Sequence, residues 1–301
     1  MSGRSSQGPR RAALAATLMG LTMVMGAPAF AGPTPAPPTL ATPIRLVAAG
    51  SLRGALQRII ALWETDHGDA PVALEVGPAG WLRDQIIAGR PFDLFVPAAT
   101  SHAEAVHQAG LGGSPVLLLH NRLCAMVRAD RNVDAATIVN FVLAPATRIG
   151  TSAPGSDPGG DYANAWYHAL DLHHPGAFAS LSQRSTVVSG KPSAKGDKPA
   201  DAQTRLADGS LDVIIGYCSG PPAQAGDATR KIPLPPPAPI ADYALTITSR
   251  DDPRVLPLAR FLLAPAAQTI LREQGFVTLS NQEIQQARGS LCRETPTPGS
   301  C

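Results

Sequence analysis

The stretch IRLVAAGSLRGALQRIIALWETDHGDAPVALEVGPAGWLRDQII, residues 44–87, contains the local patterns that decide the fold. Its apolar runs at residues 44–50 and 72–77 predict two β-strands bounded by turn residues. The apolar residues between these runs recur at helical spacing over residues 51–66: Leu52, Leu56, Ile59, Ile60 and Trp63. The stretch therefore predicts a strand, a helix and a second strand in succession.

The same alternation continues along the chain. A second helical pattern begins with Leu82 and Ile86. Further strand-like runs occupy residues 92–98, 117–128, 148–152, 211–217 and 241–248. Strands that alternate with helices are typical of parallel-rich sheets flanked by helices on both faces, so we predict an α/β fold.

Length and charge restrict the classes of function. The chain has 301 residues, of which 44% are hydrophobic and 16% charged, which is enough for two domains or one large one. Its formal charge is +2, but removing residues 1–31 leaves 22 basic and 23 acidic residues, a net charge of −1. A chain with this balance and no basic block lacks the electrostatic footprint of nucleic-acid binding.

The N-terminal segment has the layout of a secretory signal peptide. Arg4, Arg10 and Arg11 precede an apolar stretch at residues 12–27, and Ala29-Phe30-Ala31 follows it. We expect cleavage before Gly32, and a periplasmic protein, because the apolar run is shorter than the roughly 20 residues that span a bilayer. Export through the general or the twin-arginine pathway stays open. Residues 32–43 are Pro-rich and predict an extended tether.

Four cysteines remain after this cleavage, at positions 124, 218, 292 and 301. In an oxidising compartment an even number is consistent with two disulfides, in one of three pairings. Cys292 and Cys301 flank a Pro-containing segment, and we expect them to pair. No Cys/His cluster has zinc spacing, so we expect no metal site and no cofactor.

Motifs for catalysis are missing from the sequence. It contains no G-x-S-x-G elbow, no H-E-x-x-H, no G-x-G-x-x-G after a strand and no Walker loop. A catalytic triad assembled from distant residues is recognised only by geometry. We therefore expect a protein that is not an enzyme and keep a secreted hydrolase as a minor alternative.

Three helix starts follow strands directly and begin with small residues, at Gly50-Ser51, at Ala79-Gly80 and at residues 157–160 (DPGG). Such junctions present unpaired backbone N–H groups and the positive end of a helix dipole, which together suit an oxyanion. Each junction alone is equally consistent with an ordinary turn capped by Ser or Asp. Three of them in one α/β chain without a catalytic motif favour a binding function.

Six segments span nearly all of residues 44–279: VAAGSLRGAL (47–56), VGPAGWLRDQIIAGRPFDLFVPA (76–98), NRLCAMV (121–127), SDPGGDYANAWYHAL (156–170), VIIGYCSG (213–220) and ARFLLAPAAQTILREQGF (259–276). In their sequence and order, these segments together resemble the periplasmic molybdate-binding component of ABC importers, within the type II solute-binding proteins. The resemblance implies a two-lobe type II periplasmic-binding fold with crossing strands and a ligand cleft between the lobes. It also implies C-terminal helices that return to the first lobe.

On this basis we assign lobe 1 to residues 44–120 and lobe 2 to 121–248. Residues 249–281 would return to lobe 1, and 282–301 would form a C-terminal tail. The ligand-contacting positions carried over from the family are Ser51, Ala79, Ala98, Asp157 and Tyr217. In the family, hydroxyls and backbone N–H groups at these positions bind a tetrahedral dianion. A fully deprotonated oxyanion such as molybdate or tungstate needs only donors.

Two of these positions depart from the family pattern. Ala79 stands where a Ser hydroxyl is usual, and Asp157 stands where an apolar residue is usual. A carboxylate beside a buried anion would weaken binding. If Asp157 instead turns onto its own helix as an N-cap, it still competes with the anion for the same N–H groups. Arg53 is either a solvated residue or a counter-charge, and Ser156 is a candidate for the missing hydroxyl. Cys218 is a small buried residue or half of a disulfide with Cys124.

The sequence as a whole predicts a monomeric periplasmic binding protein that captures a small oxyanion and delivers it to a membrane ABC permease. Two alternatives keep the same fold. The first is a binding protein for a different small solute, and the second is a periplasmic accessory protein without a transport role. Ala79 and Asp157 favour these alternatives, because both residues weaken a pocket built only from donors.

Overall fold

The stretch at residues 44–87 forms parallel strands joined by helices, as its pattern predicts. Strand β1 (Ile44–Ala49) pairs in parallel with β2 (Val72–Gly77) on one side and with β3 (Leu94–Val96) on the other. The connection from β1 to β2 begins as the 3₁₀-helix η1 (Gly50–Leu52) and continues as α1 (Arg53–Asp66). The predicted apolar face of this segment, including Trp63, is buried. Hydrophobic burial of that face holds the helix against the sheet.

The structure is a computed structural model that describes residues 42–68, 70–190, 202–221, 224, 226–248 and 252–293. These residues all belong to one compact unit. The predicted signal peptide at residues 1–31 lies outside them. Within the described part of the chain, no helix is both long enough and apolar enough to cross a membrane.

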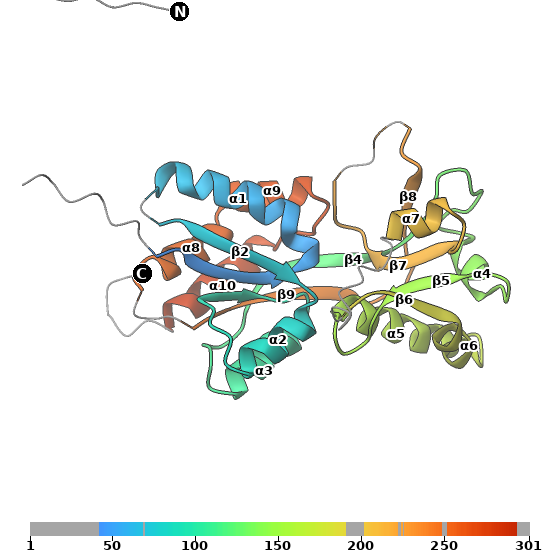
Figure 1. The fold of residues 1–301 in the computed structure, drawn as a ribbon, viewed down its shortest axis with the longest axis horizontal. Helices are drawn as coiled ribbons and strands as arrows, with labels where there is room; N and C mark the ends of the chain where they lie inside the picture. Colours follow the sequence, from blue (N-terminus) through green and yellow to red (C-terminus); the bar gives the residue numbers. More distant parts are fainter. Residues whose placement is uncertain are drawn as a thin grey trace, which may run out of the picture. The chain divides into compact units, whose positions relative to one another are not determined.

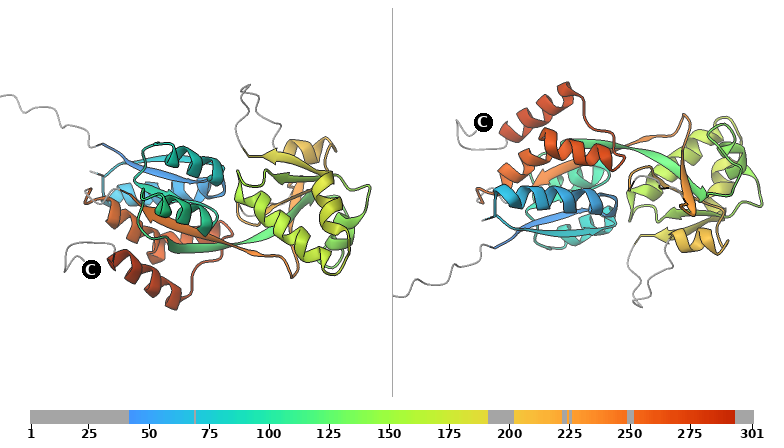
Figure 2. Two further views of the ribbon diagram at one scale, coloured as in Figure 1. Left: turned by 90° about the horizontal axis from the view of Figure 1, so that it is seen from below. Right: turned by 90° about the horizontal axis from the view of Figure 1, so that it is seen from above.

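Two long strands connect the two halves of the sheet. β4 (Val116–Arg128) and β9 (Ile240–Ile247) pair antiparallel with each other, and β9 also pairs with β3. On the other side, β4 pairs antiparallel with β7 (Val213–Tyr217) and β8 (Thr229–Pro233). Figure 2 shows β4 and β9 running between two groups of helices and strands.

Parallel pairing resumes beyond β7. β5 (Ile149–Ser152) pairs in parallel with β7 and with β6 (Ser185–Ser189), which gives the strand order β2-β1-β3-β9-β4-β7-β5-β6. The predicted α/β class is confirmed, with parallel strands at both ends of the order and antiparallel strands at the crossing. The sequence analysis did not predict β6 and β8.

Helices cover the sheet in two groups (Figure 1). The helices near β1–β3 are α1, α2 (Ala79–Ile87), α3 (Thr100–Gln108), α8 (Val255–Leu262), α9 (Pro265–Glu273) and α10 (Asn281–Arg293). The helices near β5–β8 are α4 (Ile138–Leu143), α5 (Pro158–Asp171), α6 (Ala177–Arg184) and α7 (Ala202–Ala207).

Each group has its own hydrophobic core. One cluster joins β1, α1, β9 and the C-terminal helices, and it includes Trp63, Leu262 and Leu291. The other joins β4, β5, α5 and β7, and it includes Trp166. We call these two parts the first lobe and the second lobe. The C-terminal helices therefore return to the first lobe, and α10 covers the start of the segment that we predicted as a tail.

The exact lobe boundaries stay a prediction. The predicted boundary between residues 120 and 121 falls inside β4, which runs without interruption from the first lobe into the second. Residues 249–251, where we predicted the chain to leave lobe 2, lie outside the described residues.

A disulfide joins the second-lobe strands where they meet the crossing. Cys124 in β4 is bonded to Cys218, which directly follows β7, with a Cα–Cα distance of 4.9 Å. This pairing is one of those that the even number of cysteines permitted. Cys301 lies outside the described residues, so the Cys292–Cys301 disulfide stays a prediction.

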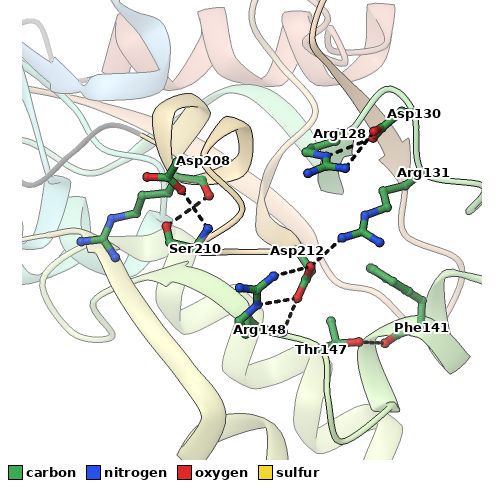
Figure 3. A network of polar contacts seen from close by, with 10 residues as sticks. Arg128, Asp130, Arg131, Phe141, Thr147, Arg148, Asp208, Ser210 and Asp212 are labelled. Carbon is green, nitrogen blue, oxygen red and sulfur yellow. Dashed lines mark hydrogen bonds and ion pairs between the residues drawn. The ribbon is translucent and has the colours of Figure 1, made fainter.

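An ion-pair network holds the start of the second-lobe strands (Figure 3). Asp212, next to β7, accepts hydrogen bonds from the Arg148 Nε at 2.8 Å and backbone N–H at 3.0 Å, and from Arg131 Nη2 at 3.0 Å. Arg148 precedes β5, so the contact fixes how β5 meets β7. Asp212 is the central carboxyl of this network. The hydrogen bond from Arg148 lowers the pKa of Asp212, although burial acts in the opposite direction.

A second polar cluster anchors α10 to the crossing strands. His120 of β4 contacts Asp242 of β9 through Nδ1 at 2.6 Å and Glu283 of α10 through Nε2 at 3.2 Å. Burial lowers the pKa of His120, but its hydrogen bonds to the two carboxylates outweigh burial and raise it overall. Hydrogen bonds from Ser280, which begins the capping box of α10, together with His120, lower the pKa of Glu283 to about 2.

Candidate functional site

A cavity of about 330 Å³ lies between the two lobes. The first lobe lines it with the ends of β1, β2 and β3 and the starts of η1 and α2. The second lobe lines it with the ends of β5 and β6, the start of α5 and part of β7. Its lining includes all five predicted ligand-contacting residues: Ser51, Ala79, Ala98, Asp157 and Tyr217. The structure thus brings these positions together, while their role in binding stays a prediction.

The three helix starts that the sequence singled out meet at this cavity. η1 begins at Gly50 and α2 at Ala79, and neither start carries a side-chain cap. The first backbone N–H groups of such helices have no partner within the helix, and they lie at the positive end of the dipole. α5 differs, because Asp157 caps it. Two helix starts without a side-chain cap and one capped start therefore surround the cavity.

Ser51 is held by a buried hydrogen-bond chain. Its Oγ lies 2.8 Å from Oη of Tyr243, and Asn121 Nδ2 donates to that same Oη at 3.2 Å. Burial raises the pKa of Tyr243, so its hydroxyl stays protonated. Because Tyr243 has a single proton and accepts from Asn121, it can donate to Ser51. The hydrogen of Ser51 is then left to donate into the cavity.

The hydroxyl of Tyr217 is buried, and no described residue hydrogen-bonds to it. Burial raises the pKa of Tyr217 well above its usual value, and the nearby Tyr243 hydroxyl and Asp157 carboxylate act in the same direction. The group is therefore a protonated donor. A buried donor without a partner costs about 1–3 kcal/mol, which a hydrogen-bonding ligand would recover.

Asp157 is the N-cap of α5, as one of our two interpretations predicted. Its Oδ1 accepts from the Gly159 N–H at 3.1 Å, and its Oδ2 accepts from the Ser189 hydroxyl at 2.7 Å. Pro158 occupies the first helical position, which needs no N–H partner. Asp157 nevertheless lines the cavity, so its carboxylate both occupies the Gly159 N–H of α5 and places a negative charge in the wall.

The remaining candidates differ in whether they line the cavity. Ala79 and Ala98 are buried in the wall and contribute methyl groups and backbone there. Arg53 also lines the cavity and makes no ion pair with any described residue, so it is available as a counter-charge. Ser156 is not among the lining residues, and the suggestion that its hydroxyl replaces the one missing at Ala79 stays an untested prediction.

The sequence reasoning missed two hydroxyls in the wall. Ser152 ends β5 and Ser189 ends β6, and both line the cavity. The signal for Ser152 was its place at the end of the predicted strand at 148–152, because ligands in α/β folds gather at strand ends. Ser189 had no comparable signal, since β6 was not predicted.

Comparison with known proteins places the chain in a family. Residues 44–277 match the family model described as bacterial extracellular solute-binding protein. An uncharacterized protein of Pasteurella multocida is 28% identical over 187 residues, which covers 58% of this chain and 74% of the relative. The chain therefore belongs to the family of bacterial extracellular solute-binding proteins.

Solved structures of binding proteins share the fold. The periplasmic molybdate-binding protein of Azotobacter vinelandii aligns with a TM-score of 0.64 and 19% identity, covering 79% of this chain and all of that one. The sulfate-binding protein SubI of Mycobacterium tuberculosis aligns with a TM-score of 0.66 and 17% identity, covering 85% and 92%. These likenesses establish the two-lobe type II periplasmic-binding fold, and at such identities they extend to the fold alone.

Proposed function

We propose that this protein captures a small oxyanion, molybdate or tungstate, and delivers it to the membrane permease of an ABC importer. The observation that carries the proposal is the meeting of two uncapped helix starts with the hydroxyls of Ser51 and Tyr217 in one cavity. These groups are neutral donors. A fully deprotonated tetrahedral anion needs donors and no acceptor, so such a wall suits it.

The chemistry of the proposed site is binding and release without a covalent step. Tyr217 supplies a proton donor that has no hydrogen-bond partner among the described residues, and Tyr243 orients Ser51 toward the ligand. Arg53, at the start of α1, supplies a positive charge in the wall. We propose that the mature protein begins at Gly32, acts in the periplasm as a monomer and needs neither a metal nor a cofactor.

A different small solute is the second candidate, and Asp157 favours it. Its carboxylate lies in the wall, and Ala79 supplies no hydroxyl. The cavity of about 330 Å³ is also at the lower end of the ~300–1,000 Å³ that ligand pockets of organic molecules occupy. Asp157 could accept a hydrogen bond from a solute that carries its own donor, whereas its negative charge would repel a dianion.

A thermal-shift screen separates the two candidates. The mature protein is heated with molybdate, tungstate, sulfate, phosphate or simple organic acids at equal ionic strength. A ligand at about 100 times its Kd stabilises the folded state by about 2.7 kcal/mol, which raises the melting temperature. We expect molybdate and tungstate to raise it most. A shift with organic acids and none with either metal oxyanion would favour the second candidate.

A further inference from the structure

A direct backbone contact closes the cleft beside the cavity. The N–H of Trp81 in α2 of the first lobe donates to the carbonyl oxygen of Ser156, before α5 of the second lobe, at 3.1 Å. Trp81 is the third residue of α2, so its N–H has no acceptor within the helix. The second lobe supplies that acceptor, and separating the lobes would break this hydrogen bond.

The same contact depends on a glycine. A Cβ placed on Gly80 would lie 2.4 Å from the carbonyl oxygen of Gly155 and 2.9 Å from that of Ser156. Both neighbours are backbone atoms, so they cannot move aside as the end of a flexible side chain does. Any residue other than glycine at position 80 is therefore incompatible with the observed approach of the lobes.

The second-lobe side of the contact is held in place by its own lobe. The Gly155 N–H donates to the Asp161 carboxylate at 2.7 Å, and the Asp157 N–H donates to the carbonyl oxygen of Ala153 at 2.9 Å. Gly155 adopts a φ of 74°, which favours glycine in this turn. The turn thus presents its carbonyls to α2 in a fixed geometry and would resist being displaced by a larger residue 80.

We propose that Gly80 is a positioning residue whose lack of a side chain lets Trp81 and Ser156 latch the two lobes around the bound solute. The inference rests on the proposed function, since a latch of this kind serves a protein that encloses a ligand. Ala79 directly precedes Gly80, Asp157 directly follows Ser156, and both Ala79 and Asp157 line the cavity. Forming the Trp81–Ser156 hydrogen bond therefore also fixes where these two residues of the cavity wall lie.

The test compares Gly80→Ala with Gly54→Ala. Both glycines lie in helices, where alanine is the better helix former, so neither change should impair folding. A Cβ on Gly54 would meet only the end of the Gln274 side chain at 3.2 Å, and Gly54 does not line the cavity. Gly54→Ala thus controls for the added methyl group and for helix propensity.

The first readout needs no ligand. Hydrogen exchange at the Trp81 amide, followed by NMR, reports whether its bond to Ser156 is formed. We expect exchange at least tenfold faster in Gly80→Ala than in the wild type and unchanged in Gly54→Ala, with the melting temperatures of both variants at or above that of the wild type. Equal exchange in the wild type and Gly80→Ala would overturn the proposal.

The second readout uses sodium molybdate as the probe. If the wild type binds it, Gly80→Ala should bind at least tenfold more weakly and Gly54→Ala equally well. Equal affinity in Gly80→Ala would overturn the latch. If the wild type ignores molybdate, the proposed function fails in its specific form, and the exchange rates at Trp81 still decide the latch by themselves.

Discussion

Replacing Asp157 by Asn isolates the charge in the cavity wall from the shape of the wall. The asparagine side-chain oxygen can still accept from the Gly159 N–H, and Asn and Asp are comparable N-caps, so stability should change by only about 0.5 kcal/mol or less. Asp157→Val removes the cap as well and should lower the free energy of unfolding by about 0.5–2 kcal/mol. Both variants remove the negative charge.

The size of the electrostatic effect follows from the cavity. Its volume of about 330 Å³ equals that of a sphere of about 4 Å radius, so an anion at the centre lies about 6 Å from a charge in the wall. At that distance and an effective dielectric constant of about 20, two unit charges interact by about 3 kcal/mol. A dianion doubles the repulsion from Asp157 to about 6 kcal/mol, and the attraction to Arg53 is the same in both proteins and does not enter the difference. We therefore expect molybdate to bind up to roughly 10⁴-fold more tightly to Asp157→Asn.

Titration calorimetry at fixed ionic strength measures this gain. Glu104→Gln is the matched control, because it removes one negative charge from α3 outside the cavity wall and should leave the Kd unchanged. Unchanged or weaker molybdate binding by Asp157→Asn would refute the reasoning. That result would mean that the carboxylate does not oppose the ligand or that it accepts a hydrogen bond from it.

Four further predictions concern other parts of the molecule. Tyr217→Phe should weaken oxyanion binding by about 1.5–3 kcal/mol without lowering the melting temperature, because it removes a donor to which no described residue hydrogen-bonds; calorimetry and thermal unfolding measure the two effects. Replacing Cys124 and Cys218 by Ser should lower the free energy of unfolding by about 2–5 kcal/mol in denaturant titrations, since the disulfide closes a 94-residue separation. Because its folded pKa is raised, His120 should contribute stability that is complete below pH of about 6.5 and is lost as the pH rises through that folded pKa; His120→Gln should flatten this part of the stability profile. Mass spectrometry of the exported protein should find Gly32 at its N-terminus, and retention of residues 1–31 would contradict the signal-peptide prediction.

The sequence predicted the elements whose residues are strongly patterned. β1, β2 and β7 are short apolar runs between turn residues, and α1 repeats its apolar residues at helical spacing, so local pattern and tertiary burial agree. β6 and β8 were missed for a physical reason. Among the described residues, β6 pairs only with β5 and β8 only with β4, and β8 carries Arg230 and Lys231. Edge strands tolerate polar residues and lose the pattern that identifies buried strands.

Family resemblance selected residues that the structure brings together, but it could not give their hydrogen bonds. Ser51 and Tyr217 both line the cavity, while their role in ligand binding stays a prediction. The sequence could not show that Tyr243, 192 residues from Ser51, orients that hydroxyl, or that Ser189 donates to Asp157. These contacts join residues that are distant in the chain, so no local pattern reveals them. Ser156 is next to Asp157 in sequence, but it is not among the residues that line the cavity.

Titration of molybdate into the mature wild-type protein tests the central claim most directly, with Ser51→Ala measured beside it under the same conditions. The account predicts saturable binding with one molybdate per protein and a loss of about 1.5–3 kcal/mol in Ser51→Ala, the usual value of a hydrogen bond to a charged group. Wild-type protein that binds neither molybdate nor tungstate, or that binds molybdate with the same affinity as Ser51→Ala, would contradict the assignment of this cavity as an oxyanion site.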